Sequence, residues 1–397
     1  MRLESIQSLR ALAVLVVFFF HLQFIESEMI AALGSQESTL IGGLFQNGYA
    51  GVDLFFVISG FIIVYVTGRA DAGRYPLGSF LFARAARIYL PWWFFASLLG
   101  VYFWITYGAP WDVEELSRDG RSPAWHLIAS FLLLPQDDFP LLGVGWTLVH
   151  EMHFYFIFAL LLLLPYRLRV AGLIAWAGIV ILGGLAGLAQ PFAKDLIALF
   201  FSPLTLEFLM GGMAALLVVN GFRWRPGLLA IGGLLGFGLA MVFHELQAEW
   251  TLVWGRVLWF GVPGAVLTYG LVSLDLEGRY RAPPGATALG DWSYGLYLCH
   301  MLVLSAVHRL HFIAADMGEA HLGVPSWAAN LLRVGSPGWA DNLTLLITGS
   351  VATLITAWLT YRFFEQPMLH HASRLRRHLF EGRDGSLEPQ PIRAMVW

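Results

Sequence analysis

The chain has 397 residues, of which 57% are hydrophobic and 13% charged, and its formal net charge is −3. Soluble domains average about 25% charged residues, so this composition excludes an ordinary soluble protein and indicates an all-α integral membrane protein. The small net charge gives no reason to expect a nucleic-acid partner. The single cysteine, Cys299, cannot form an internal disulfide and does not report the redox compartment.

Apolar windows of about 20 residues are long enough to cross a bilayer, and they recur along the whole chain. A shorter apolar stretch at 125–135 is expected to form an interfacial or re-entrant helix. We predict a ten-helix transmembrane domain over residues 1–370 and a loose basic and polar tail over 371–397. The predicted spans are 7–25, 49–68, 88–107, 147–165, 170–189, 203–220, 227–243, 256–273, 293–313 and 343–364.

The basic residues are distributed unevenly between the loops. With the N-terminus inside, only six of the 24 basic residues lie on the outer side. Cytoplasmic loops carry an excess of Lys and Arg, so both termini are predicted to be cytoplasmic and the chain to lie in the cytoplasmic (inner) membrane. A cleaved signal peptide is the alternative for the first apolar run, but that run lacks a small-x-small cleavage site. The six outer residues are Arg118, Arg121, Lys194, Arg256, Arg309 and Arg333.

The first span carries two polar residues that are costly inside a bilayer, Arg10 and His21. Eleven residues make about three helical turns plus 20°, so both side chains share one face, about 16 Å apart. The residues between them are Ala, Leu, Val and Phe. A cation and an imidazole on one apolar stripe favour a lined cavity over a lipid-facing surface.

Asp53 lies at the outer entrance of the second span. It either caps the helix in solvent or accepts a hydrogen bond from His21, since a short link makes the first two spans neighbours. Such a bond would orient His21 and raise its basicity. The sequence leaves both interpretations open.

Arg84 and Arg87 precede the third span and share one helical face, because they are three residues apart. They either follow the positive-inside bias or bind a ligand that carries phosphate groups. The pattern alone leaves both interpretations open.

The fourth span places His150, Glu151 and His153 at the outer end of a helix. The segment HEMH differs from the zinc signature H-E-x-x-H because its histidines are three residues apart, so no metal site is expected. Glu151 is either an interfacial cap or a group that binds the acceptor or handles protons.

Two further polar residues stand out in the last two spans. His300 lies two turns after Ser293 on one face and either makes a helix–helix hydrogen bond or takes part in catalysis. Glu365 is followed by Pro367, which is expected to end the last span at the inner interface. Arg362 is three residues before Glu365 and can pair with it.

Six segments occur in an order and spacing that resemble the membrane-bound acyltransferase 3 family. They run from residue 5 to residue 367, nearly the whole chain, and are jointly specific although each alone is weak. The amino-acid sequence of the opening segment resembles that of the bacterial exopolysaccharide O-acetyltransferase branch. The segments are SLRALAVLVVFFFH (8–21), GVDLFFVISGF (51–61), RAARIYLPWW (84–93), WTLVHEMHFY (146–155), LGDWSYGLYLCH (289–300) and FFEQP (363–367).

The resemblance implies ten spans, an acyl-CoA donor taken from the cytoplasm, and acyl transfer to a hydroxyl group, usually on a sugar. Some members carry a fused outer hydrolase-like domain, and the residues after 367 are too few to supply one. His21 matches the essential histidine of the family and Arg10 its partner. Arg84 and Arg87 match a contact with the CoA phosphates. We place Asp53 and Glu151 with the catalytic residues, and His300 and Glu365 as supporting residues.

The expected donor is acetyl-CoA as a co-substrate, with no tightly bound cofactor and no metal, because a thioester is already activated. The expected acceptor is a polysaccharide or its lipid-linked precursor, and a small glycoside such as a macrolide is the alternative. His21 acts either as a general base or as a carrier of the acyl group. A transporter of a small anion or lipid-linked sugar and a structural subunit with an inactive site are the competing classes, and release of CoA thiol distinguishes the enzyme from both.

Overall fold

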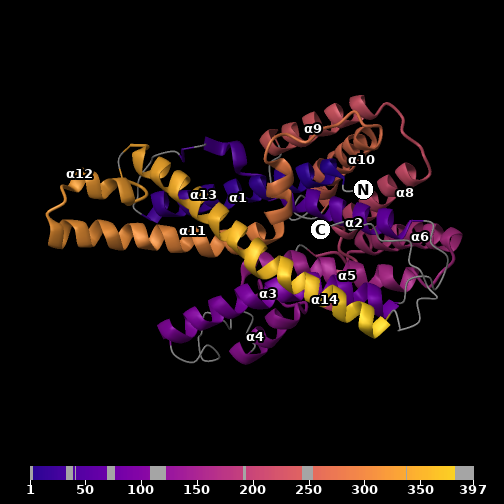
Figure 1. Cartoon of the computed structure of the whole chain (residues 1–397), viewed down its shortest axis with the longest axis horizontal. Helices are drawn as coiled ribbons and strands as arrows, with labels where there is room; N and C mark the ends of the chain where they lie inside the picture. Colours follow the sequence, from indigo (N-terminus) through magenta and orange to yellow (C-terminus); the bar gives the residue numbers. More distant parts are fainter. Residues whose placement is uncertain are drawn as a thin grey trace.

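The computed structural model describes residues 3–32, 39–40, 42–68, 77–107, 122–190, 194–243, 254–336 and 338–380. Every regular element in these ranges is helical, and Figure 1 shows their arrangement. The elements are α1 (Glu4–Ala32), η1 (Gly42–Phe45), α2 (Ala50–Thr67), α3 (Leu77–Tyr107), α4 (Pro123–Leu132), η4 (Gly143–Gly145), α5 (Trp146–Leu161), α6 (Tyr166–Leu185), α7 (Leu196–Phe200), α8 (Thr205–Val219), α9 (Pro226–Phe243), η6 (Val257–Gly261), α10 (Val262–Leu276), α11 (Ala286–Leu322), α12 (Ser326–Ala329), η7 (Asn330–Leu332), α13 (Ala340–Thr360), η8 (Tyr361–Glu365) and α14 (Gln366–Phe380).

Ten helical segments in the described ranges are long and apolar enough to cross a membrane. This finding confirms the predicted membrane class and the predicted number of spans. The short helix α4 is apolar but falls below that length, as the sequence predicts for its region. Several spans extend beyond the predicted windows; α3, for example, begins at Leu77. The windows miss such extensions because arginines that are buried in protein lower the mean hydropathy of a helix that continues through them.

Successive spans run in alternating directions. We call the end of the bundle where α1 begins and α2 ends the proximal end, and the opposite end the distal end. The proximal ends of α1 and α10 are joined because Ser5 donates hydrogen bonds from its backbone N–H and its hydroxyl to Asp275, both at 2.8 Å. At the left of Figure 1, α11 and α13 lie side by side and extend distally together with α12.

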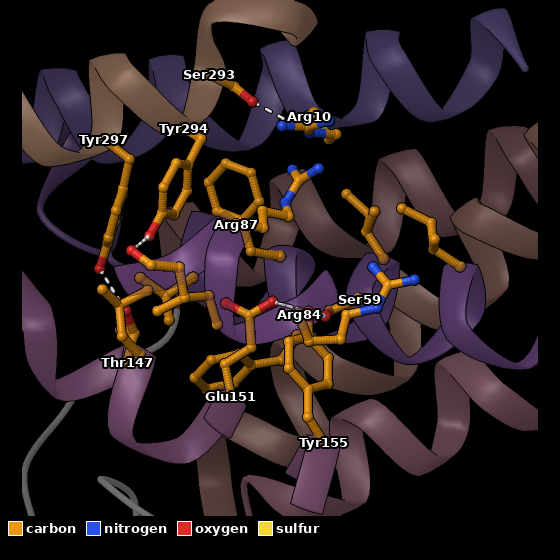
Figure 2. Close-up of a pocket in the computed structure, with 17 residues that line it drawn as sticks. Arg10, Ser59, Arg84, Arg87, Thr147, Glu151, Tyr155, Ser293, Tyr294 and Tyr297 are labelled. Atoms are coloured by element: carbon orange, nitrogen blue, oxygen red, sulfur yellow. Dashed lines mark hydrogen bonds between the residues drawn. The ribbon is translucent and has the colours of Figure 1, made fainter. Parts of the chain in front are cut away.

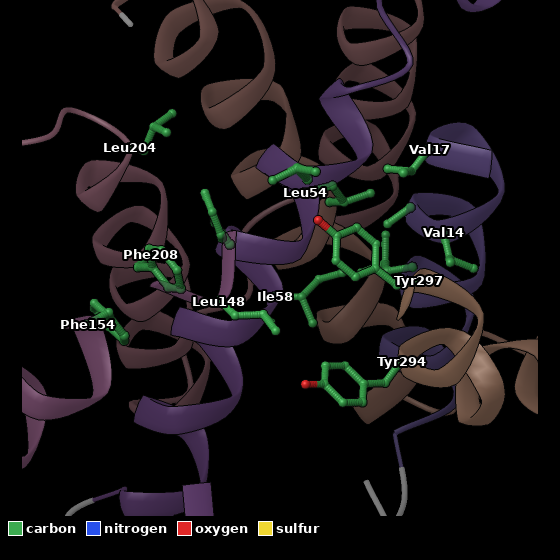
Figure 3. Packing of buried hydrophobic residues seen from close by; sticks show 14 of the residues in the cluster. Val14, Val17, Leu54, Ile58, Leu148, Phe154, Leu204, Phe208, Tyr294 and Tyr297 are labelled. Carbon is green, nitrogen blue, oxygen red and sulfur yellow. The ribbon is translucent and has the colours of Figure 1, made fainter. Parts of the chain in front are cut away.

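The centre of the bundle is formed by helices that approach closely at glycines. A Cβ atom at Gly60 of α2 would overlap the carbonyl of Phe208 on α8, and one at Gly211 of α8 would overlap the carbonyl of Val57 on α2. Small residues at such crossings let membrane helices pack backbone against backbone. Figure 3 shows the buried side chains that fill the space around α2, among them Ile58 and Phe208.

Helices α1 and α11 run parallel and in contact, although they are the first and the ninth spans. A Cβ atom at Gly290 of α11 would overlap the carbonyl of Gln7, so the two helices begin at the same level. As a result, the stripe of α1 that carries Arg10 and His21 faces α11. The predicted shared face of these two residues is therefore turned toward protein.

The last span does not end where the sequence analysis expects. Residues 361–365 form a turn of π-helix, and the chain continues as α14 to Phe380. Pro367 is tolerated because the wider π-turn has already interrupted the regular ladder of backbone hydrogen bonds. The predicted Arg362–Glu365 pair is also wrong, since Arg362 donates to Gln366 at 3.5 Å and Glu365 points into the protein.

The boundary expected at residue 370 falls within α14. This helix packs against the beginning of α3, where the rings of Phe82 and Phe380 lie 6.0 Å apart. Residues 371–380 are thus helical, whereas residues 381–397 lie outside the described ranges.

Candidate active site

A pocket in the middle of the bundle spans about 730 Å³ of space that no atom fills, part of it open to the outside. Side chains from α1, α2, α3, α5 and α11 line it (Figure 2). Its lining on α2 extends from Val52 near the distal end to Ile62, ten residues further along. At 1.5 Å per residue this is a path of about 15 Å along the helix, long enough for an extended ligand.

Three arginines, Arg10, Arg84 and Arg87, line this pocket. Arg10 donates from Nε to the Ser293 hydroxyl at 3.1 Å, and Arg10 itself is only 4% exposed. The guanidinium of Arg84 lies 5.7 Å from the ring centre of Tyr155, and that of Arg87 lies 5.9 Å from the ring centre of Tyr294. The structure thus combines the arginine of the first span with the arginine pair of the third, in a pocket that suits an anionic ligand.

Two carboxylates accompany these arginines. Glu151 lines the same pocket and accepts hydrogen bonds from the Ser59 hydroxyl at 2.9 Å and from the Tyr155 hydroxyl. Glu365 is 2% exposed and lies within the electrostatic reach of Arg87 and Arg10. Glu151 is therefore part of a half-buried hydrogen-bond network on the wall of the pocket. Such networks hold buried charges that would be costly alone.

His21 and His300 form a direct hydrogen bond, with 3.0 Å between Nδ1 of His21 and Nε2 of His300. His21 lies on α1 and His300 on α11, at the distal side of the pocket. Neither residue lines the pocket itself. Each histidine is predicted separately from the sequence as a candidate functional residue, and the parallel packing of α1 and α11 brings the two together.

Two backbone carbonyls determine which nitrogen of each histidine carries its proton. Nδ1 of His300 lies 3.2 Å from the Leu296 carbonyl, and Nδ1 of His21 lies 3.0 Å from the Val17 carbonyl. A carbonyl oxygen only accepts, so both Nδ1 atoms carry hydrogen. In the neutral pair, the single Nδ1–H of His21 is then shared between the Val17 carbonyl and Nε2 of His300. Nε2 of His21 keeps a lone pair that can accept a proton.

Asp53 is neither a solvated cap, because its side chain is 0% exposed, nor a hydrogen-bond partner of His21. Asp53 instead forms a two-pronged ion pair with Arg256, whose Nε and Nη2 donate at 3.0 and 2.8 Å. The physical reason is the position of each residue along the axis of the bundle. Gly51 of α2 packs against the carbonyl of Ala13, which lies eight residues, or about 12 Å, before His21 on α1. Asp53 is therefore about two turns too proximal to reach the imidazole.

Arg256 and Glu207 belong to this buried cluster, and sequence reasoning assigned neither a role. Glu207 is fully buried beside Asp53, and the Arg256 guanidinium lies 5.0 Å from the ring centre of Tyr49 and 5.4 Å from that of Trp146. From the sequence, Arg256 stands out only as one of the six outer basic residues. A usable signal is the position of each charged residue at the distal end of an apolar span, where an ionised side chain needs a partner.

The two histidines of the fourth span face different surroundings. His150 packs against Phe56 and Trp146, whereas His153 packs against Trp176 and Phe200. They belong to the packing of α5, and the structure does not bring either one to the His21–His300 pair.

The fold and the pocket define a multi-pass membrane protein with an arginine-lined pocket, which we call the chamber, next to paired histidines. Comparison with known proteins identifies its class. The family model described as "Acyltransferase domain" matches residues 3–362, so the chain belongs to this acyltransferase family. This confirms the family to which the six sequence motifs point.

Two curated relatives cover most of the chain. The exopolysaccharide production protein ExoZ of Rhizobium meliloti is 30% identical over 283 residues, which are 68% of this chain and 80% of that protein. The acyltransferase MdmB of Streptomyces mycarofaciens is 27% identical over 347 residues, which are 80% of this chain and 83% of that protein. No solved structure matches the chain.

Proposed function

We propose that this protein is a membrane-embedded O-acyltransferase that moves an acetyl group from cytoplasmic acetyl-CoA to a hydroxyl of an exported or cell-surface polysaccharide or its lipid-linked precursor. The observation that carries this proposal is the chamber lined by Arg10, Arg84 and Arg87 beside the His21–His300 pair. Membership of the acyltransferase family supports the reaction class. The name of the relative ExoZ, an exopolysaccharide production protein, supports the choice of acceptor.

The donor enters from the proximal end in this proposal. The phosphates of CoA lie against Arg84 and Arg87, with Arg10 further along the chamber. Guanidinium groups suit this task because they stay charged and bind phosphate oxygens in pairs. The pantetheine arm is extended and uncharged, which fits the long, mostly apolar stretch of the chamber along α2.

The histidine pair supplies the acid–base chemistry. Nε2 of His21 removes the proton of the acceptor hydroxyl as its oxygen attacks the carbonyl carbon of the thioester. The C–S bond then breaks, and the protonated imidazole returns the proton to the departing thiolate as CoA thiol. His300 accepts the Nδ1–H of His21 throughout, so the imidazole is held in the tautomer that leaves Nε2 free.

The proposal is tested with radiolabelled acetyl-CoA in inverted membrane vesicles that contain the wild-type protein. We expect label in sugar-containing products together with release of CoA thiol. Movement of a lipid-linked substrate without acylation, and without CoA thiol, would instead identify a transporter. Vesicles without the protein are the control for other acyltransferases.

The arginine pair should act mainly on donor binding. Replacing both Arg84 and Arg87 by glutamine removes two cationic forks from the chamber. Hydrogen bonds to charged groups contribute about 1.5–3 kcal/mol each, so we expect the KM for acetyl-CoA to rise at least about tenfold while the acceptor KM changes little. Initial rates against donor concentration check this result. An unchanged donor KM would assign the arginines to membrane topology alone.

We propose that the proximal end faces the cytoplasm, in keeping with the excess of arginine in its loops. Cys299 is the single cysteine of the sequence and is buried, so a second cysteine can be labelled selectively. Cysteine at Trp327, which is 71% exposed at the distal end, should react with an impermeant maleimide in intact cells. Cysteine at Arg225, in the proximal turn before α9, should react only after permeabilisation. The reverse pattern would invert the orientation.

A further inference from the structure

Tyr297 lies between the donor chamber and the histidine pair. It lines the chamber, and its ring centre is also 5.9 Å from that of His300. On its other side the ring lies 5.9 Å from Phe55, another residue of the chamber wall. Because Tyr297 lines the chamber and His21 and His300 do not, a ligand in the chamber contacts Tyr297 and neither histidine.

The ring is held in this position by its hydroxyl. The Tyr297 Oη lies 3.0 Å from the Val144 carbonyl of η4 and 2.9 Å from the Thr147 Oγ1 at the start of α5. A carbonyl only accepts, so the tyrosine donates to Val144. The Thr147 hydroxyl also lies 3.0 Å from the same carbonyl. These bonds span from α11 to the beginning of α5 and tie the ring across the distal end of the chamber.

A second tyrosine on the same helix provides a comparison. Tyr294 is three residues before Tyr297, lines the same chamber and donates its hydroxyl to the Ile88 carbonyl on α3 at 3.0 Å. It lies beside Arg87, at the proximal part of the chamber. Its hydroxyl is bonded to a backbone carbonyl in the same way, but Tyr294 does not lie between the chamber and the histidine pair.

We propose that Tyr297 is a gate that separates the donor thioester from the His21–His300 pair and opens when its tether to Val144 and Thr147 breaks. In the closed position the ring keeps the thioester away from the imidazole and from water on the distal side. In the open position the acyl carbonyl reaches Nε2 of His21. The closed gate thereby protects the thioester from hydrolysis. This inference rests on the proposed acyltransferase function.

The test needs no acceptor, because it measures hydrolysis of acetyl-CoA to acetate and CoA thiol by the purified full-length protein in proteoliposomes. Loss of one buried tether hydrogen bond in Tyr297→Phe should raise the hydrolysis rate at saturating donor about three- to tenfold, and Tyr297→Ala should raise it further. The increase should depend on the histidine, so the double variant Tyr297→Ala/His21→Ala should return to the rate of His21→Ala alone.

The matched comparison is Tyr294→Phe, which removes the equivalent hydroxyl from the proximal part of the chamber. It is expected to weaken donor binding without accelerating hydrolysis. Equal hydrolysis rates for Tyr297→Phe, Tyr297→Ala and wild type would overturn the gate, as would an increase that persists without His21. Gel filtration and binding of acetyl-CoA show whether each variant is folded. A wild-type protein that does not bind acetyl-CoA would overturn the proposed function. A wild-type protein that binds acetyl-CoA, together with Tyr297 variants that hydrolyse it at the wild-type rate, would overturn the gate alone.

Discussion

Replacing His21 by alanine is expected to lower acyl transfer about 10²–10⁴-fold, the range that a positioned general base contributes. The substitution removes the Nε2 lone pair and also the partner of His300. His21 is only partly buried, so a smaller side chain should not prevent folding. Transfer of label from acetyl-CoA in vesicles, normalised to the amount of protein in the membrane, measures the effect.

His300 should show a smaller and separable effect. It touches His21 and not the acceptor in the proposed step, so it is a positioning residue. His300→Ala should lower transfer, and His300→Gln should restore part of it, because a glutamine oxygen can accept the Nδ1–H of His21. A structural role alone would give no such rescue. His311→Ala, three turns further along α11 with its imidazole beside Thr348, is the control. Activity retained in His21→Ala would contradict the assignment of the reaction to this pair.

Breaking the Asp53–Arg256 pair is expected to destabilise the protein by about 3–5 kcal/mol, because it leaves one charge buried without its partner. The Asp53 side chain is 0% exposed and that of Arg256 10% exposed. Arg256→Met and Asp53→Leu should each lower the midpoint of thermal unfolding in detergent. Both residues lie away from the arginines of the donor chamber, so the loss should appear in stability before it appears in donor affinity.

The double variant Asp53→Leu/Arg256→Met provides the decisive comparison. Replacing a buried ion pair by apolar side chains is often neutral or even stabilising, so the double variant should be more stable than Arg256→Met, which leaves the buried carboxylates Asp53 and Glu207 together without a cation. Arg333→Met is the control for arginine removal, since Arg333 pairs with the partly exposed Asp316 and Glu319 and exposed pairs contribute little. Additive losses in the double variant would show that the two side chains do not stabilise one another.

Part of this protein follows from local sequence properties. The ten spans, the short helix over α4 and the exclusion of a soluble fold depend on runs of apolar residues that must avoid water, and such runs are visible in the chain. The shared face of Arg10 and His21 follows from helical periodicity alone. The prediction that Arg84 and Arg87 lie on one face is local in the same sense, and both residues line the chamber. The family could be inferred from six ordered motifs because they keep the same spacing along the chain.

Only the tertiary structure decided which of these residues meet. The partner of His21 is His300, 279 residues away, and the partner of Asp53 is Arg256, 203 residues away. Such pairs depend on which spans pack together and on how far each span is displaced along the bundle. Close glycine crossings set both, such as Gly51 of α2 against Ala13 of α1 and Gly290 of α11 against Gln7 of α1. A shift of one helical turn between two spans changes every partner by about 5.4 Å. Hydropathy and periodicity carry no information about that shift. The number of spans could therefore be predicted, whereas the partner of Asp53 could not.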